Sequence, residues 1–123
     1  MSNGRASIRL ILRKILKLGK GDEVLLPAYV FQGLLDPFEE SDMTIKFYKL
    51  NRDLTLDASD IKRKINENTK VLFILHYFGF PQPVEQLKEL REAYPSCSVI
   101  EDIVQSFFTT RLDSSLGRFG DFS

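Results

Sequence analysis

Four short apolar runs alternate with helical segments, and this alternation limits the folds that the chain can adopt. The runs predicted to be strands are residues 24–26, 45–50, 71–75 and 98–100. Strands separated by helices are joined by right-handed crossovers, which place them side by side in a mostly parallel sheet with helices on both faces. We therefore expect an α/β domain whose ligand lies beyond the carboxyl ends of the strands.

The segments between these runs have the spacing of helices. The predicted helices are residues 5–18, 30–41, 58–66 and 83–93. We expect Gly19 and Gly21 to end the first helix. Pro37 should interrupt or kink the second. Either Asp57 or Ser59 could cap the third.

The first predicted helix is basic, with six Lys or Arg residues and no acid between positions 5 and 20. Its apolar residues follow the i, i+3, i+4, i+7 spacing of one helix face: Ile8, Ile11, Leu12 and Ile15. A transit peptide or a membrane-surface helix can have this composition. No cleavage-like segment follows, however, and a strand begins at once. We predict an amphipathic helix packed on the core, with a solvated basic face.

Composition excludes several classes of function. The 17 Lys and Arg residues balance the 17 Asp and Glu residues, which gives no general reason to expect a nucleic acid or an anionic membrane as partner. No apolar run is long enough to span a bilayer. The single cysteine, Cys97, rules out an internal disulfide, and one Cys with one His leaves a metal site almost without such ligands. We expect a cytoplasmic protein without a metal.

Two polar residues close to the end of the fourth predicted strand are candidates for chemistry. Asp102 would present a partly desolvated carboxylate to the ligand crevice, where it suits a cationic ring nitrogen. Asp102 could equally be a loop residue that caps the next turn. Gln105 follows three residues later and would share a face with Asp102 on a helical turn, although alone it could be an ordinary surface glutamine.

Two aromatic residues and one helix start are further candidates. Tyr29 and Phe31 follow the first strand and could stack on a flat ring, although aromatics at such positions are more often core residues. Gly4, Arg5 and Ala6 open the first helix, where free backbone N–H groups bind phosphate and Arg5 could add charge. Neither a GxGxxG after a strand nor a GxxxxGK[ST] motif is present, so nucleotide binding by those motifs is unsupported.

The sole histidine, His76, ends the third predicted strand. A sole histidine invites a catalytic interpretation. No Ser or Cys nucleophile motif lies nearby, so we predict a hydrogen-bonded structural role for His76. Cys97 precedes the fourth strand, and we predict that it packs in the core.

Four motifs occur in series: GDEVLLPAYVF at 21–31, VLFILHYFGFPQP at 71–83, VIEDIVQSF at 99–107 and LGRFGDFS at 116–123. Together they resemble the DegT/DnrJ/EryC1/StrS aminotransferases, which are fold-type-I enzymes that use pyridoxal 5'-phosphate (PLP). The resemblance covers nearly the whole chain. It implies that residues 1–123 are the N-terminal part of the PLP-binding large domain, without the small C-terminal domain.

The resemblance also implies a role for each matching residue. Asp102 matches the acid that pairs with the pyridinium nitrogen, Gln105 a position near the ring hydroxyl, and Phe31 the aromatic that stacks on the ring. Tyr29 is the weaker stacking candidate. The helix start matches the segment that holds the phosphate. The implied cofactor-binding residues are Gly4, Arg5, Ala6, Phe31, Asp102 and Gln105.

The activity that the resemblance implies is transfer of an amino group from a donor such as glutamate to a nucleotide-linked keto sugar. Such reactions serve cell-surface polysaccharide or secondary-metabolite biosynthesis, and the family forms homodimers. The family's Schiff-base lysine would fall after Ser123, so residues 1–123 carry no catalytic match and are expected to be inactive alone. The alternatives are a PLP-dependent dehydratase or a non-catalytic sensor of the same family, and a stand-alone flavodoxin-like α/β binding module.

Overall fold

A computed structural model of the chain describes residues 4–77 and 82–102. Its helices are α1 (Gly4–Leu10), α2 (Asp36–Glu40), α3 (Ala58–Lys64) and α4 (Val84–Ala93), with a π turn η1 (Ile11–Ile15) and a 3-10 turn η2 (Gln32–Leu35). Its strands are β1 (Glu23–Pro27), β2 (Thr44–Tyr48), β3 (Thr69–Leu75) and β4 (Ser98–Asp102). All four predicted strands are confirmed, with boundaries that differ by at most two residues.

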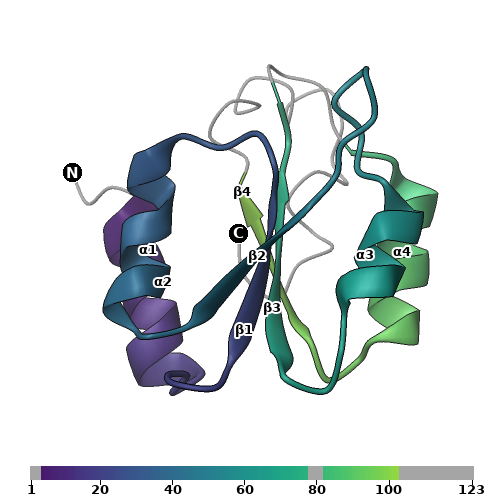
Figure 1. Cartoon of the computed structure of the whole chain (residues 1–123). Coiled ribbons are helices and arrows are strands. Elements are labelled where there is room, and N and C mark those ends of the chain that lie inside the picture. The colour runs from purple at the N-terminus through teal and green to yellow at the C-terminus, as the bar shows by residue number, and fades with distance from the viewer. Residues whose placement is uncertain (1–3, 78–81, 103–123) are drawn as a thin grey trace.

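The four strands form one sheet in the order β2-β1-β3-β4, and each pair is parallel. Figure 1 shows three layers, with α1 and α2 on one face of the sheet and α3 and α4 on the other. The predicted α/β class, with a parallel sheet covered on both faces, is confirmed. Because every strand runs the same way, the carboxyl ends of all four lie at one end of the sheet.

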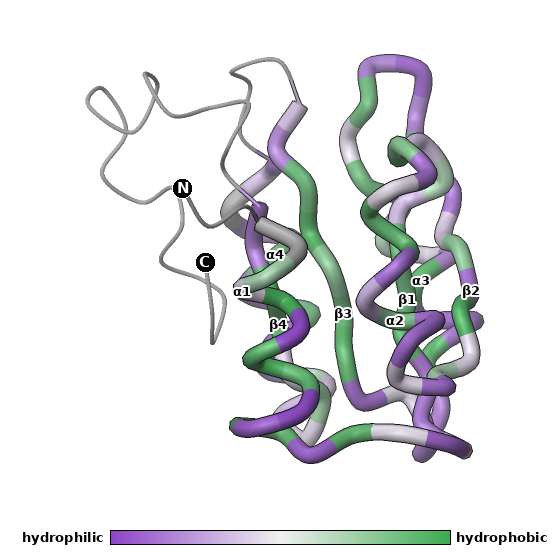
Figure 2. The backbone as a smooth tube through the Cα atoms, turned by 90° about the vertical axis from the view of Figure 1, so that its left-hand side faces the viewer, coloured by the Kyte–Doolittle hydropathy of each residue, from purple (hydrophilic) through white to green (hydrophobic). Residues whose placement is uncertain are grey.

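Strand side chains alternate between two hydrophobic cores, as a period of two requires. Figure 2 shows β3 hydrophobic along most of its length, as expected for a strand buried on both faces. The core under α1 and α2 contains Ile8, Leu12, Val24, Leu26, Phe38, Val71, Phe73 and Ile100. The core under α3 and α4 contains Leu25, Tyr48, Ile61, Leu72, Ile74, Leu90, Cys97 and Val99. Cys97 is thus packed, as predicted.

The first helix ends earlier than predicted. Its last turn is the π turn η1, which inserts one residue into the helical repeat and rotates the apolar stripe. Ile15, predicted to face the core, is 53% exposed for this reason, and Leu16 packs against the core instead. The turn that follows is made by Lys17, at φ 54°, so Gly19 does not end the helix. Gly21, at φ 93°, does take a conformation that suits glycine.

The basic face of this helix is solvated, as predicted. Arg9 Nε donates to Glu40 Oε2 at 2.8 Å, and Arg13 lies 3.8 Å from the same carboxylate. Glu40 belongs to α2, so these pairs join the two neighbouring helices on one side of the sheet (Figure 1). Within residues 4–77 and 82–102, no helix has the length and apolar character needed to cross a membrane.

The choice between the two cap residues of α3 is resolved. Asp57 caps the helix, because its side chain accepts a hydrogen bond from the backbone N–H of Asp60 at 3.1 Å. Ser59 lies within the helix and is exposed. The predicted second helix is interrupted, since η2 ends at Leu35 and α2 begins at Asp36; Pro37 occupies the first turn of α2, where its missing N–H is not needed.

Candidate functional site

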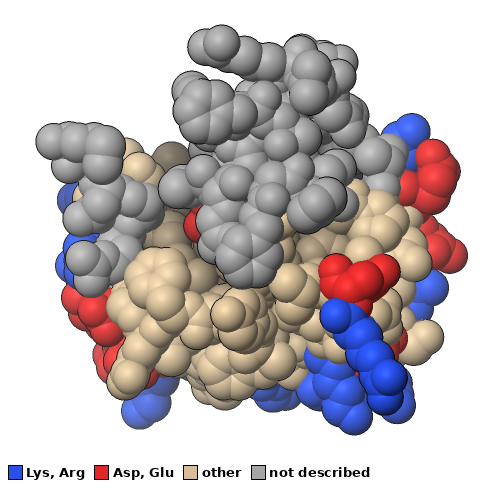
Figure 3. Space-filling view, turned by 90° about the horizontal axis from the view of Figure 1, so that it is seen from above, with Lys and Arg blue, Asp and Glu red and all other residues tan. Residues whose placement is uncertain are grey.

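The carboxyl ends of the strands form the candidate site, as expected for a parallel sheet. Figure 3 looks down on this end of the molecule. The charged side chains of the described residues lie mainly toward its sides, and uncharged side chains occupy much of the remaining described surface.

Asp102 is the last residue of β4 and is half-buried. It is in register with Leu75, the last residue of β3, and its carbonyl accepts a hydrogen bond from His76 N–H at 3.2 Å. Ile100, two residues earlier, packs in the core under α1 and α2. Because alternate strand residues face the same way, the Asp102 side chain also lies on the α1/α2 face.

The aromatic residues that follow β1 are exposed, Tyr29 by 60% and Phe31 by 61%, so the alternative that they are core residues is excluded. The chain leaves the sheet after the buried Pro27, and neither ring is covered. Their segment is anchored by Tyr77, whose hydroxyl donates to the Tyr29 carbonyl at 2.6 Å and whose ring lies 5.8 Å from the Tyr29 ring. Burial raises the pKa of Tyr77, so this hydroxyl keeps its proton.

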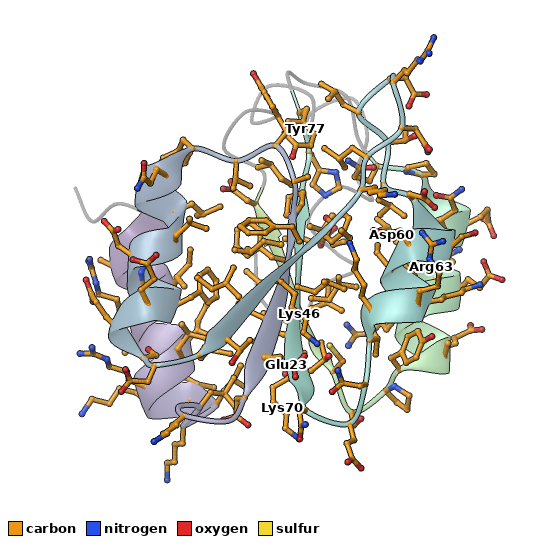
Figure 4. The ribbon with its side chains drawn as sticks, in the orientation of Figure 1. Glu23, Lys46, Asp60, Arg63, Lys70 and Tyr77 are labelled. Carbon is orange, nitrogen blue, oxygen red and sulfur yellow. The ribbon has the colours of Figure 1, made fainter. Side chains whose placement is uncertain are left out.

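Figure 4 shows Tyr77 at the carboxyl end of β3, in the region where Asp102 ends β4. Tyr77 packs in the core under α1 and α2, and so does Leu34 of η2, which follows Phe31. The start of α1, with Gly4 at its first position and an exposed Ala6, belongs to the same layer. The fold therefore assigns these predicted elements to one face of the sheet. Gln105 lies outside the described residues.

His76 is a buried structural residue, as predicted. Its Nε2 lies 3.1 Å from Glu101 Oε1, and its Nδ1 accepts a hydrogen bond from the backbone N–H of Gln82 at 2.9 Å. Since Nδ1 accepts, the ring proton resides on Nε2, which donates to the Glu101 carboxylate. His76 and Glu101 are each 1% exposed, and Gln82 is 4% exposed.

The side chain of Gln82 joins three segments of the chain. Its Oε1 accepts from Leu56 N–H at 2.8 Å, and its Nε2 donates to the carbonyls of Leu54 at 3.0 Å and Leu75 at 3.1 Å. Sequence reasoning did not single out Gln82 or Glu101. Strand alternation could have revealed Glu101, because Asp102 and Glu101 are adjacent in a strand and must face opposite ways.

A second buried carboxylate, Asp60 of α3, was also not predicted. Asp60 accepts from Lys49 N–H at 2.7 Å and pairs with Arg63 at 2.6 Å and Lys64 at 2.9 Å. Burial opposes ionisation, but the Lys64, Lys49 and Arg63 contacts outweigh it and lower the pKa of Asp60. Figure 4 shows Asp60 and Arg63 on α3, on the face of the sheet opposite α1 and α2. This cluster joins α3 to the residue after β2, so its role is structural.

The candidate site offers a carboxylate and two exposed aromatic rings, with a helix start in the same layer. This chemistry suits a flat, cationic ring that carries a phosphate, and therefore fits PLP. The fold and the types of these residues are those expected of part of a PLP-dependent α/β domain. The strand order alone is less specific, because β2-β1-β3-β4 also begins a flavodoxin-like sheet.

The model of the DegT/DnrJ/EryC1/StrS aminotransferase family matches residues 1–123, and the chain belongs to this family. A similar curated protein is GDP-perosamine synthase from Escherichia coli O157:H7, which is 31% identical over 124 aligned positions. That alignment covers 100% of this chain and 34% of the relative, so the chain spans about a third of the relative's length. The family assignment disfavours a stand-alone flavodoxin-like module.

Solved structures agree with this assignment. NtdA from Bacillus subtilis, whose structure contains the bound cofactor PMP, has a TM-score of 0.81 at 26% identity, over 96% of this chain and 26% of NtdA. DesV from S. venezuelae has a TM-score of 0.73 at 27% identity, over 84% of this chain and 28% of DesV. The four-stranded parallel sheet is thus part of a fold-type-I aminotransferase domain.

Proposed function

We propose that this chain forms the ring-binding side of the PLP site in an aminotransferase that acts on a nucleotide-linked keto sugar. The observation that supports this most directly is the position of Asp102, which is half-buried at the end of β4 on the α1/α2 face. Family membership and the 31% identity to GDP-perosamine synthase support the transfer reaction and the sugar nucleotide.

Bound PLP supplies an electron sink for the negative charge that develops on a substrate carbon. In this proposal Asp102 keeps a proton on the ring nitrogen, because a carboxylate next to a cation stabilises the charged form. Phe31 covers one face of the ring and excludes water from it, with Tyr29 as its neighbour. Gln105 hydrogen-bonds the ring hydroxyl.

The phosphate is assigned to the start of α1. In this proposal Gly4, Arg5 and Ala6 hold the phosphate, because the first turn of a helix carries partial positive charge that favours an anion. The proposed amino donor is an amino acid such as glutamate, and the whole protein is proposed to act as a homodimer in the cytoplasm. The residue at the family's lysine position separates this transferase from the dehydratase and sensor alternatives.

The proposal is tested by titrating the purified chain with pyridoxamine 5'-phosphate (PMP) and following cofactor fluorescence. PMP carries an amine in place of the aldehyde, so it cannot react with surface lysines. We expect saturable one-site binding that Asp102→Asn weakens about tenfold, since the variant loses a charge but keeps its shape. The control Glu67→Gln, exposed in the α3–β3 connection, should bind like the unmodified chain.

Two outcomes would contradict the proposal. Unaltered PMP affinity in Asp102→Asn would show that this carboxylate does not hold the ring. An absence of saturable PMP binding would show that residues 1–123 do not form a cofactor site of their own.

A further inference from the structure

A buried polar trio, His76, Gln82 and Glu101, lies across the sheet from the candidate site. His76 falls between Leu75 and Tyr77, which both pack under α1 and α2, and Glu101 falls between Ile100 and Asp102. Strand alternation therefore places the His76 and Glu101 side chains on the α3/α4 face, opposite Asp102. His76 and Glu101 thus lie on one face of the sheet at the ends of β3 and β4, and Asp102 lies on the other face.

His76 makes two hydrogen bonds to the end of β4, one through its backbone and one through its side chain. The backbone N–H of His76 donates to the Asp102 carbonyl at 3.2 Å, which extends the β3–β4 ladder by one residue. The His76 side chain binds Glu101, the residue before Asp102, at 3.1 Å. The Asp102 carbonyl and the Glu101 side chain are therefore both bonded to His76.

Gln82 fixes His76 in turn. Its backbone N–H donates to His76 Nδ1 at 2.9 Å, which selects the tautomer that donates from Nε2 to Glu101. Its side chain binds the carbonyls of Leu54 and Leu75 and the N–H of Leu56. The connections that follow β2 and β3 therefore meet the end of β4 in one hydrogen-bonded unit.

Burying three polar side chains costs desolvation energy that apolar residues of the same size would not, so packing alone does not account for the trio. The end of a strand frays unless it is held. We propose that His76, Glu101 and Gln82 are positioning residues that hold Asp102 in the orientation needed by the cofactor ring. This proposal rests on the proposed function, because it concerns the use of Asp102.

The test uses His76→Asn in the full chain. The asparagine oxygen can still accept from Gln82 N–H, as Nδ1 does, but the shorter side chain cannot reach Glu101. We expect PMP affinity to fall about tenfold, as is typical when a residue that orients a ligand-binding group is lost. We also expect hydrogen exchange of the residue 76 amide, which donates to Asp102, to become about tenfold faster.

The matched control is Tyr48→Phe, which removes a buried hydrogen bond of 2.8 Å to the Phe73 carbonyl on the same face. This variant should leave both PMP affinity and amide exchange at residue 76 within about twofold of the unmodified chain. Should His76→Asn fail to fold, Glu101→Gln replaces it. Glu101→Gln keeps size and an acceptor but weakens the bond from Nε2, and we expect PMP affinity to fall about threefold.

The proposal is overturned if folded His76→Asn, or Glu101→Gln in its place, binds PMP as the unmodified chain does while Asp102→Asn binds weakly. That combination leaves the proposed function intact. If instead Asp102→Asn binds PMP normally, the proposed function fails. The exchange rate at residue 76 does not depend on PMP, so an unchanged rate in His76→Asn rejects the positioning role by itself.

Discussion

The two faces of the sheet differ sharply where the strands end. On the α1/α2 face the strand ends carry exposed rings, Tyr29 and Phe31, and the half-buried Asp102. On the α3/α4 face they carry His76 and Glu101, which are 1% exposed and bonded to each other. Residues adjacent in sequence therefore have opposite environments, one open to a ligand and the other closed to it.

This difference follows from the geometry of a strand. Successive side chains point to opposite faces, so a strand that presents Asp102 to a ligand must present Glu101 to the other side. A buried carboxylate is tolerated only with a partner, which His76 supplies. An exposed ring, by contrast, needs no partner. The ligand-facing side can therefore change with little effect on stability, and the opposite side cannot.

Removal of the His76 imidazole should have the largest effect on the difference in stability between the two faces. His76→Leu leaves the Glu101 carboxylate buried without its imidazole partner, and loss of one member of a buried polar pair costs about 3–5 kcal/mol. Phe31→Leu, on the exposed side, should change the free energy of unfolding by less than about 0.5 kcal/mol. Urea unfolding followed by circular dichroism measures both. Similar losses in the two variants would show that the faces do not differ as described.

The sheet could be predicted from sequence because its signals are local. Each strand is a short apolar run bounded by turn residues, and helices between strands dictate parallel pairing. The phase of the first helix could not be predicted in the same way. The π turn at Ile11–Ile15 inserts a residue into the repeat, which exposes Ile15 and buries part of Leu16. Pattern counting assumes a uniform helix and misses such an insertion.

The candidate site also has features that the sequence could predict and features that it could not. Sequence and family resemblance placed Asp102 at the end of a strand, and the fold confirms that position. The exposure of Phe31 could not be read from its type, because aromatic residues serve both cores and ligands. The role of Gln82 was hidden as well, because Leu54 and Leu56, which it binds, lie 28 and 26 positions away in sequence. Only a three-dimensional structure brings such partners together.

Ion pairs also differ between the faces. Asp60 on α3 is 2% exposed and accepts from Lys49 N–H as well as pairing with Arg63 and Lys64. We expect Asp60→Asn to lower the free energy of unfolding by about 1–3 kcal/mol, because the buried donors lose a charged acceptor. Arg9→Gln, which breaks the exposed pair with Glu40 on the α1/α2 side, should leave the unfolding midpoint unchanged within error.

The pH dependence of the free energy of unfolding distinguishes a contribution from the ionised Asp60 carboxylate from a contribution of its packing alone. Its pKa is lowered in the folded chain, so its contribution is complete above the unfolded pKa of about 4 and is lost as pH falls toward the folded pKa. The stability difference between the unmodified chain and Asp60→Asn should therefore be constant from about pH 7 to pH 5 and shrink below about pH 4. Urea midpoints across this range test it, and a difference that persists at low pH would exclude an ionised Asp60.

The smallest effects compare two buried tyrosines that occupy opposite faces. Tyr77 donates to the Tyr29 carbonyl at 2.6 Å, and Tyr48 donates to the Phe73 carbonyl at 2.8 Å. Burial raises the pKa of both phenols, so each remains a donor, and either change to Phe should cost about 1 kcal/mol in urea unfolding. Only Tyr77→Phe loosens the segment that carries Phe31, so it alone should weaken PMP binding, by about threefold. Equal PMP affinity in the two variants would show that the anchoring of that segment does not matter to the ring.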